Sequence, residues 1–483
     1  MSIFGEHLRT LIDSNKINIY SFAKSVGLER TAMHKIMSGG RIPSQEYATK
    51  LIDALPLSPS ERQNLLESYN ISKIGEFRYR QRTQVKNLIE SIAYIENGIK
   101  TSNNSSAASI PTLSETNFAA TGHFAVNNLV KGVIEEAAEN KNCQELDFVI
   151  PENYQFFYNE LLAAYLLCPS LRIRHIIAFT KKVDFPESSN SNLTLLSHVL
   201  PFAFAPGFAY FPYYYFRNSP DTELTQSMPY FILTSSKKLV LIDSDFSKAA
   251  LICDSDIVEL YRNNYTVMLQ QGKPLIKRFD SVFEVLGHYR SINHHADAPT
   301  HWVEPEPCIG PLVTDEIINK YIKHDLPHRA ELITMVCMHY GILRENQLRN
   351  LNICTTNGLS QMVRTGYIYN APSELMNPIS RETMKELLIT LRNRIEGKKV
   401  KVLFTNPSKF VLPSKTLLSV NRITGLNFIM HSSGTDLRAF FLSEDSINEA
   451  FVDFVESLED AGLVYNENES LNALDKAINE MFS

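Results

Sequence analysis

Apolar side chains recur three and four positions apart along the N-terminal part of the chain, a spacing that predicts short amphipathic helices. These helices are expected over about residues 3–12, 22–26, 29–37, 44–55 and 60–69. Gly27 and the pair Gly39-Gly40 can take the left-handed conformation that ends a helix, and the Ser60 hydroxyl would cap the last one. The residues expected to face inward are Ile3, Phe4, Leu8, Leu11, Ile12, Phe22, Ala23, Val26, Leu28, Met33, Ile36, Tyr47, Ala48, Leu51, Ile52, Leu55, Leu65, Leu66 and Tyr69.

A further helix is predicted over residues 84–98, and a single apolar stripe runs along it. The stripe consists of Val85, Leu88, Ile89, Ile92 and Ile95. One such stripe suits docking on a larger body, whereas two stripes from two chains suit dimerisation as a coiled coil. The serine- and asparagine-rich residues 101–109 that follow are typical of a flexible linker.

Beyond Phe118 the pattern changes to short apolar strands that alternate with helices, which is typical of an α/β layer fold. We therefore predict an α+β multidomain protein, with an all-α bundle followed by a two-part α/β body. The expected body elements are strands at 146–150 and 173–179, a helix at 158–167, a hairpin of 231–233 with 239–242, and a helix at 254–270. The expected domains are residues 1–72 (helical bundle), 73–115 (basic segment, helix and linker), 116–300 and 301–483 (the two body halves).

A faint internal repeat favours two related halves in the body. Residues 250–261 can be laid on residues 440–451 without a gap, with Ile257 on Ile447. Each segment reads as an apolar strand, an acidic capping turn and an amphipathic helix. Each half also has an upstream strand ending in Phe-Thr, at Phe179-Thr180 and Phe404-Thr405.

The charge of the chain is divided between these parts. The whole sequence has 47 Lys and Arg against 53 Asp and Glu, a net charge of −6, which by itself argues against a nucleic-acid partner. Residues 1–82 hold 12 of the cations and 8 of the anions, or +4, so the remainder holds 35 and 45, or −10. A small basic head on an acidic body is expected when one domain meets phosphates and the other does something else.

Three short segments of the head carry a resemblance to a known family. They are Phe-Ala-Lys-Ser-Val-Gly-Leu at 22–28, Thr-Ala-Met-His-Lys-Ile at 31–36 and Gly-Gly-Arg-Ile-Pro-Ser at 39–44. Residues 4–57 thereby resemble the λ-repressor/Cro-like helix-turn-helix, or xenobiotic-response-element family, of transcriptional regulators. Two positions depart from that family: Met37 stands where a glutamate is most frequent, and Tyr20 where a glutamine commonly contacts phosphate.

The resemblance implies that the third helix enters the major groove of double-stranded DNA. Arg30 is the best candidate for direct readout, because arginine prefers the O6 and N7 acceptors of guanine. Lys24 and Arg41 would bind phosphate, as would Arg78, Arg80 and Arg82 if they lie near the duplex. The full set of candidate DNA-binding residues is Lys24, Arg30, Thr31, His34, Lys35 and Arg41. A helical bundle that contacts only protein is the alternative.

No catalytic or cofactor motif is recognisable in the chain. Phosphate-binding glycine loops, a nucleophile elbow and the helical zinc-protease motif are all missing from the sequence. A zinc or iron site could be drawn from His294, His295, Asp297 and His301, near Glu304 and Cys308. Adjacent histidines on an extended chain point to opposite sides, so an exposed loop is the favoured interpretation. We expect no enzyme activity, cofactor or metal, and we expect Cys337 and His339 to be core residues.

Residues 188–216 contain no charged side chain, which raises the question of a membrane span. Pro201, Pro206, Gly207 and Pro212 interrupt this stretch, so a buried segment is favoured and no membrane partner is expected. The aromatic run 202–216 within it could line an effector pocket or simply fill the core, and the core is favoured. The six cysteines form no CxxC pair and the N-terminus has no signal-peptide pattern, so we expect a cytoplasmic protein.

These patterns predict a cytoplasmic, homodimeric transcriptional regulator with a repressor-like head and a body that senses a small-molecule or peptide effector. The two-half body resembles the sensor domains of the phospholipase D-like superfamily, but the catalytic histidine, lysine and aspartate pattern of that family is missing. A DNA-tethered nuclease or hydrolase and a peptide-pheromone-responsive regulator are the alternatives. Peptide-pheromone-responsive regulators are usually all-helical arrays. The strand patterns near residues 173 and 231 argue against such a regulator.

Overall fold

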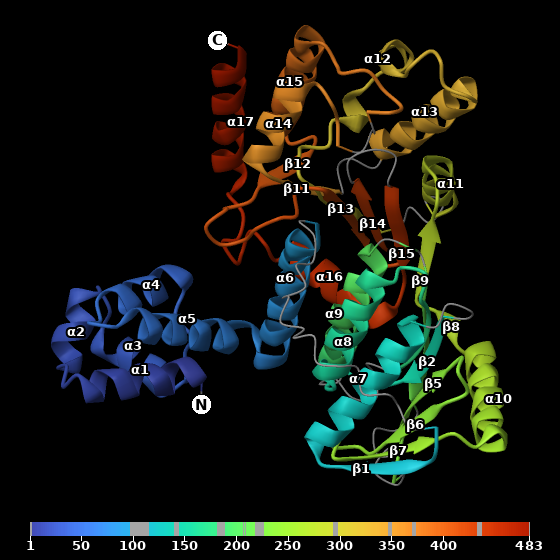
Figure 1. Cartoon of the computed structure of the whole chain (residues 1–483). Coiled ribbons are helices and arrows are strands. Elements are labelled where there is room, and N and C mark those ends of the chain that lie inside the picture. The colour runs from blue at the N-terminus through green and yellow to red at the C-terminus, as the bar shows by residue number, and fades with distance from the viewer. Residues whose placement is uncertain are drawn as a thin grey trace. The chain divides into compact units, whose positions relative to one another are not determined.

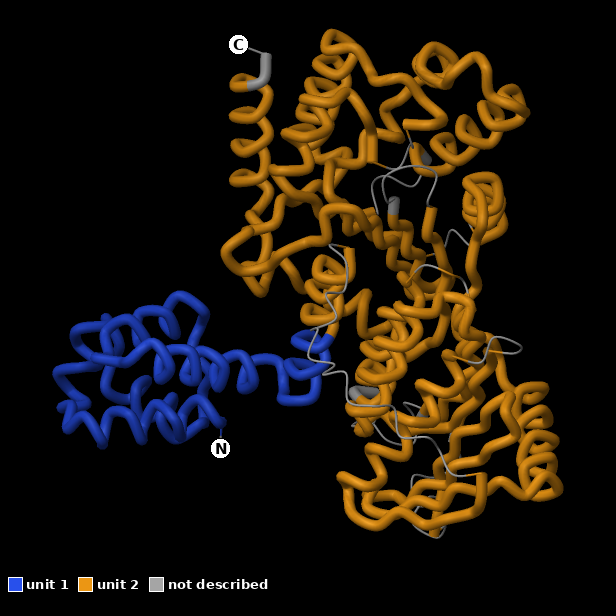
Figure 2. Tube along the Cα trace, in the orientation of Figure 1, with its two compact units in different colours: residues 1–84 blue, residues 85–483 orange. Residues whose placement is uncertain are grey.

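The computed structural model describes residues 2–96, 115–139, 144–180, 189–205, 207, 209–217, 227–292, 298–345, 350–369, 373–431 and 437–482. The chain divides into two compact units, residues 1–84 and 85–483 (Figure 2). Unit 1 is entirely helical, and unit 2 contains two β-sheets with helices on their faces, as the α+β prediction requires (Figure 1). The linker predicted at residues 101–109 lies outside the described residues.

Unit 1 is a bundle of short helices around one apolar core. Side-chain oxygens of Ser2, Asn18, Ser44 and Ser58 cap its helices by accepting backbone N–H groups. The helices are α1 (Ile3–Ser14), α2 (Ile19–Ser25), α3 (Arg30–Met37), α4 (Gln45–Asp53), α5 (Pro59–Ile74) and the start of α6 (Glu76–Glu96), which continues into unit 2.

Three details of the predicted bundle are wrong. Ile3 and Leu66 are exposed, because each lies one position, about 100°, around the helix from a buried neighbour, Phe4 or Leu65. The cap of α5 is Ser58 and not Ser60: Ser58 forms a capping box with Glu61, and proline occupies the first helical position. The other residues predicted to face inward are buried or partly buried.

Unit 2 begins with the second part of α6, whose apolar stripe packs into the unit's main core. Val85, Leu88, Ile89 and Ile92 are buried there, and Ile95 is partly buried. Glu96 Oε1 and Oε2 also accept the backbone N–H groups of Lys415 and Ser414 at 2.8 Å. The stripe therefore docks on the body, and this apolar surface is not available for a coiled-coil dimer.

The first sheet has eight strands in the order β1-β7-β6-β5-β2-β3-β4-β8, and it confirms the predicted strands, hairpin and helices of residues 146–270. Its elements are β1 (Phe118–Thr121), α7 (His123–Glu139), β2 (Glu145–Val149), α8 (Gln155–Leu167), β3 (Arg172–Thr180), α9 (Ser189–Phe204), β4 (Tyr210–Arg217), β5 (Tyr230–Thr234), β6 (Leu239–Ile242), β7 (Lys248–Ile252), α10 (Ser255–Gln271) and β8 (Lys273–Pro274).

The second sheet has seven strands in the order β12-β11-β10-β13-β14-β15-β9. Its elements are β9 (Ile276–Phe279), α11 (Val282–Ile292), β10 (Thr300–Val303), the 3-10 turn η4 (Gly310–Leu312), α12 (Asp315–Tyr321), α13 (Arg329–Glu345), β11 (Leu351–Cys354), α14 (Thr356–Thr365), α15 (Arg381–Glu396), β12 (Lys401–Phe404), β13 (Thr416–Asn421), β14 (Gly425–His431), β15 (Leu437–Leu442), α16 (Asp445–Glu456) and α17 (Glu467–Phe482). The presence of two β-sheets rules out the all-helical array that is usual for a peptide-pheromone-responsive regulator.

Apart from the additional edge strand β8 of the first sheet, the two sheets have the same topology. In each, three parallel strands are joined to an antiparallel run of four, so that β1–β7 correspond in turn to β9–β15. We call residues 118–271 the first repeat and residues 276–456 the second repeat. By strand pairing, β9 and α11 belong to the second repeat, ahead of the predicted division at residue 300.

The register of the ladders matches the repeat seen in the sequence. Phe148 of β2 and Trp302 of β10 occupy equivalent positions, since Val-x-Pro-Glu begins one residue after each. The paired residues can be followed from strand to strand, starting at Phe148 in the first sheet and at Trp302 in the second. This places Ala250 at the same position as Phe440, as in the sequence match of residues 250–261 with 440–451. The Phe-Thr match is wrong, because Phe179-Thr180 ends β3 whereas Phe404 ends β12, the counterpart of β4.

The core of unit 2 has a layered arrangement. The largest cluster joins α6, α7, α8 and α9 to one face of each sheet and to α16. A second cluster lies between the other face of the second sheet and α11–α15, and a small one lies under α10. The charge-free stretch forms α9 and β4 within the largest cluster. Among the described residues, no helix is long and apolar enough to cross a membrane.

Candidate nucleic-acid interface

The turn between α2 and α3 is a Schellman motif built on Gly27. This glycine has φ +74°, a conformation that a side chain would strain. The Leu28 N–H donates to Ala23 O at 2.8 Å and the Gly27 N–H donates to Lys24 O at 3.2 Å, the two bonds that define the motif. The local sequence thereby sets the sharp change of direction that a helix-turn-helix requires.

Helix α3 is fixed by the packing of its inner side. Met33, Ile36 and Met37 are buried. Gly5 of α1 approaches so closely that a Cβ built there would lie 2.5 Å from Ile36 O. Met37 is thus a core residue, which accounts for an apolar side chain where the resembled family most often has glutamate.

The outer side of α3 presents the predicted contact residues to solvent. Arg30 and His34, and Thr31 and Lys35, are two pairs of neighbours one turn apart, and all four are exposed. The Arg30 Nε–H donates to His34 Nε2 at 3.4 Å, which is a weak bond. Lys24 on α2 and Arg41 just after α3 are exposed as well, as is Tyr20.

The candidate cations differ from many other basic residues of unit 1 in their partners. Lys24, Arg30, Lys35 and Arg41 form no ion pair with any residue that the structure describes. In contrast, Arg9 pairs with Asp13 at 3.7 Å, Lys50 with Glu46 at 2.6 Å, and Arg62 with Asp53. Unpaired cations can neutralise phosphates without first breaking an internal ion pair.

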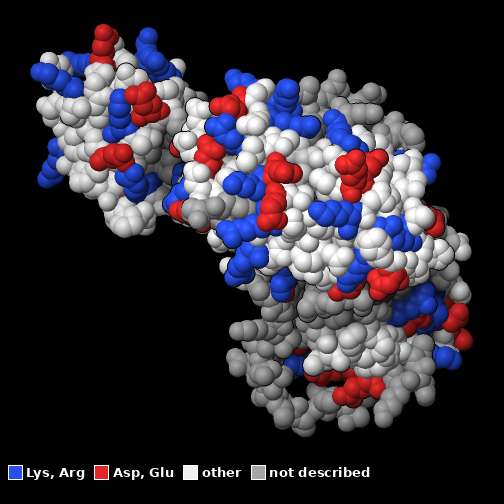
Figure 3. Space-filling view, turned by 90° about the horizontal axis from the view of Figure 1, so that it is seen from above, with Lys and Arg blue, Asp and Glu red and all other residues white. Residues whose placement is uncertain are grey.

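The basic pentad at residues 78–82 lies in the first half of α6. Arg80 in this pentad pairs with Glu76 one turn earlier, so its charge is already partly neutralised. On the face of the molecule seen in Figure 3, described Lys and Arg residues are interspersed with Asp and Glu. Continuous basic surface therefore does not mark a site on that face, and the pairing of each cation is the more informative property.

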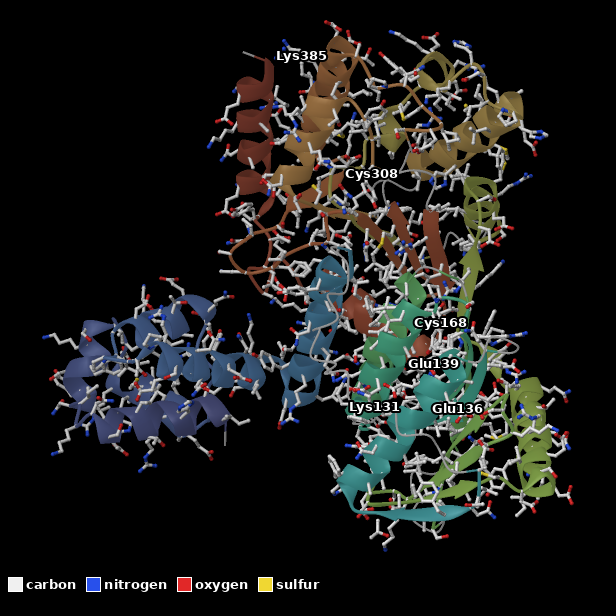
Figure 4. All side chains as sticks on the ribbon, in the orientation of Figure 1. Lys131, Glu136, Glu139, Cys168, Cys308 and Lys385 are labelled. Carbon is white, nitrogen blue, oxygen red and sulfur yellow. The ribbon has the colours of Figure 1, made fainter. Side chains whose placement is uncertain are left out.

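The metal cluster that the sequence analysis considered and disfavoured is not assembled by the described residues. His294, His295 and Asp297 lie outside them. His301 uses both ring nitrogens: Nδ1 accepts the Leu351 N–H at 3.3 Å, and Nε2 lies 3.3 Å from Glu456 Oε1. Among the described residues, no group of three histidine, cysteine or acidic side chains is placed to hold a metal. Cys168 and Cys308, labelled in Figure 4, lie in different repeats.

Several side chains in the described part of the aromatic run 202–216 pack into the core. Phe202, Phe204 and Tyr210 are fully buried. The ring centroids of Phe202 and Tyr210 are 4.8 Å apart, and those of Phe204 and Phe440 are 4.9 Å apart. The second of these contacts joins the first repeat to the second sheet.

Sequence reasoning did not anticipate a buried acidic cluster in the second repeat. Glu304, directly after β10, accepts the Asn352 Nδ2–H at 2.5 Å, and burial raises the pKa of Glu304 to about 8. Glu306 is buried too and accepts the Tyr369 N–H. The burial of Glu304 could have been predicted from the Val-x-Pro-Glu pattern that residues 303–306 share with residues 149–152. This pattern places Glu304 at the position of the buried Ile150.

Comparison with known proteins leaves the family open. No protein-family model and no curated protein sequence matches the chain. Solved structures that match the chain include TrmBL2 and a polyphosphate kinase from Porphyromonas gingivalis, each with 10% sequence identity and a TM-score of 0.21. TrmBL2 is described as an archaeal chromatin protein with a novel mode of DNA binding; the match covers 56% of this chain and 98% of that one. The kinase match covers 71% and 50%. Scores this low carry no argument, and neither family resemblance in the sequence is confirmed.

Proposed function

We propose that this protein is a sequence-specific DNA-binding transcriptional regulator of the helix-turn-helix type, in which α3 reads the major groove. The observation that carries the proposal is the set of four exposed cations that form no ion pair with any described residue. They lie on α2, on α3 and just after α3, beside a Schellman turn. The charge of +4 in residues 1–82 against −10 in the rest supports the same assignment, because the acidic body is repelled from DNA.

The roles of the contact residues follow from their chemistry. Among the described residues, Arg30 near the start of α3 makes just a weak bond to His34, so it can present its guanidinium to a guanine edge. Lys35, Thr31 and His34 supply further base or phosphate contacts from the same side of the helix. Lys24 and Arg41 flank α3 in the sequence and bind backbone phosphates.

The proposal is tested by selecting duplexes from a random pool with the full chain and measuring affinity for the selected site by fluorescence anisotropy. The double variant Arg30→Ala/Lys35→Ala should bind at least about 100-fold more weakly, since each base contact contributes about 1–3 kcal/mol. Its dependence on salt should also become shallower, because a phosphate contact is lost.

A charge-matched control is the double variant Arg62→Ala/Lys73→Ala on α5. It removes the same two residue types from an exposed part of the same unit, and it should leave affinity within about threefold, as expected for residues without base contacts. Equal loss in both double variants would show that only total charge matters, and unchanged binding in the first would remove α3 from the reading surface.

We also propose that the regulator binds DNA as a homodimer. Helix α3 has eight residues and covers few base pairs, and two half-sites about 34 Å apart multiply the contacts. Because the apolar stripe of α6 is buried in unit 2, we expect the dimer contact to use other surfaces of this unit. Light scattering on the full chain, with binding to paired and single half-sites, tests this. A monomer with equal affinity for both DNAs would contradict it.

We further propose that the protein regulates transcription without catalysing a reaction. Its body would sense a small-molecule or peptide effector. The support is the lack of recognisable catalytic motifs in the sequence. Incubation of supercoiled plasmid with the chain and Mg²⁺ or Mn²⁺ should leave the plasmid intact. Nicking that increases with protein concentration would favour the DNA-tethered enzyme instead.

A further inference from the structure

The second repeat contains a partly open apolar cavity of about 120 Å³ between its helices and one face of its sheet. Trp302 of β10, Leu417 of β13 and Ile429 of β14 form the sheet side. Tyr289 of α11 and His339 of α13 stand opposite. Further lining comes from α12 and from Ile368, Leu375, Met376 and Ile379. The cavity lies within the second apolar cluster of unit 2, whose helices are labelled in Figure 1.

The equivalent face of the first sheet is filled. By ladder register, Trp302, Leu417 and Ile429 correspond to Phe148, Tyr230 and Ile242. Aromatic rings cover that face: Phe157 lies 4.7 Å from Phe148, and Phe246 lies 6.0 Å from Tyr230, centroid to centroid. The shared sheet topology therefore does not require a hollow.

Two of the helices that line the cavity have no counterpart among the described residues of the first repeat. Helix α8 connects β2 to β3, whereas η4, α12 and α13 connect β10 to β11. Both α12 and α13 contribute to the cavity wall. Interiors are normally packed without voids larger than a water molecule, so a space of this size between added helices indicates a binding site.

The wall defines the chemistry of a ligand. None of the described residues that line the cavity is Asp, Glu, Lys or Arg. His339 as a residue is partly buried, but its Nδ1 is inaccessible and has no hydrogen-bond partner among the described residues. Burial lowers the pKa of His339 to about 4, so the imidazole is neutral near pH 7. A neutral imidazole nitrogen can donate or accept one hydrogen bond, and a hydroxyl group can satisfy either.

We propose that the second repeat binds a small, uncharged aromatic molecule with one hydroxyl group, of the phenol class, in this cavity. An engineered apolar cavity of roughly 150 Å³ stays dry and binds benzene, so the size fits one six-membered ring. The ring packs against Trp302 and the aliphatic wall, and the hydroxyl bonds His339 after the imidazole turns its unpartnered nitrogen towards the cavity. This inference does not depend on whether unit 1 binds DNA.

The test uses phenol as the probe on the full chain. Trp302 is the single tryptophan of the sequence, so its fluorescence, excited where phenol does not absorb, reports directly on this cavity. Phenol should bind at one site by calorimetry and change the Trp302 emission. Toluene should bind more weakly, since it lacks the hydroxyl, and benzoate should not bind, because its charge would be buried. No heat and no fluorescence change with phenol up to its solubility limit would overturn the proposal.

Two variants locate the site, and each is checked for folding by circular dichroism. Val336→Phe fills the cavity from α13 and should weaken phenol binding at least tenfold. Met338→Phe is its matched control, on the same helix but 40% exposed and outside the wall, and should bind phenol as the wild type does. Wild-type affinity in a folded Val336→Phe chain would refute the site.

His339→Phe separates the hydroxyl contact from ring packing and remains decisive if Val336→Phe fails to fold. Loss of one buried hydrogen bond should lower phenol affinity about tenfold while toluene affinity stays within about twofold. Equal losses for phenol and toluene would contradict a bond between the hydroxyl and His339.

Discussion

The two repeats share a sheet topology yet differ in what covers equivalent faces. Phe148 and Tyr230 in the first repeat are packed under aromatic rings, whereas their counterparts Trp302 and Leu417 in the second face a cavity. Strand order and register are set by backbone pairing, which tolerates different side chains. The connections between strands and the sizes of the covering side chains decide whether the face is filled or hollow.

The helices that follow β7 and β15 show the same divergence. Both start after an acidic cap, Asp254 for α10 and Glu444 for α16. Ile257 on α10 is 42% exposed, whereas its counterpart Ile447 is fully buried. Helix α16 packs against α9 of the first repeat, where the Asn192 Nδ2–H donates to Ser446 Oγ at 3.0 Å. Equivalent sequence positions thus meet solvent in one repeat and core in the other.

The largest expected difference between the repeats concerns pH and comes from Glu304, the counterpart of Ile150. Its pKa is about 8 when folded against 4.5 as the ordinary value, so the folded state binds the proton more tightly. Its contribution to stability is complete below pH 4.5 and is lost as pH rises towards 8. Glu304→Gln should remove this loss and be more stable than the wild type above that window, by up to on the order of 5 kcal/mol.

Urea unfolding at several pH values between 4.5 and 8 measures the effect. Glu382→Gln, at an exposed position in the same repeat, is the control and should follow the wild type. The Asn352 bond persists in Glu304→Gln because the amide oxygen also accepts. An unchanged slope of stability against pH in Glu304→Gln would show that Glu304 is solvated.

The second prediction deletes the same side chain at equivalent points of the two sheets. Ile242→Ala should lower the free energy of unfolding by about 4 kcal/mol, and Ile429→Ala by only about 2 kcal/mol. Ile429 faces the cavity and has fewer neighbours to lose. Urea unfolding followed by circular dichroism compares the two. Equal losses would mean that the second face is as well packed as the first.

The third prediction tests the helix pair. Ile447→Ala should cost about 3 kcal/mol because the side chain is fully buried, and Ile257→Ala should change stability by less than about 0.5 kcal/mol. Thermal and urea unfolding of both variants measure the difference. A large loss in Ile257→Ala would indicate that another surface, such as a second copy of the chain, covers α10.

The smallest effect is expected from adding one methylene group to each repeat, and it should have opposite signs. Val336→Ile extends into the cavity and should raise stability by about 0.5 kcal/mol. Val240→Ile adds the same group to a fully buried position of the first sheet and should lower stability by about 1 kcal/mol. Destabilisation by both changes would indicate that the cavity wall does not accept added volume.

Much of the candidate interface was predictable because it is local. The apolar spacing, the Gly27 turn and the exposure of Arg30, Thr31, His34 and Lys35 depend on residues a few positions apart. The choice of Ser58 over Ser60 as the cap of α5 was missed, although Pro59 marks the first helical position. That Lys24 and Arg41 form no ion pair with any described residue depends on the neighbours that folding brings near, so only the structure shows it.

The sequence by itself determined the helices of unit 1, most elements of the body and the correspondence of residues 250–261 with 440–451. These follow from periodicity, caps and turns, which act over a few residues. The tertiary structure decided the docking of the α6 stripe, the burial of Glu304 and Ile447, and the cavity beside Trp302 and His339. Each depends on segments far apart in the chain, and the space left between them is a property of their packing and not of any local pattern.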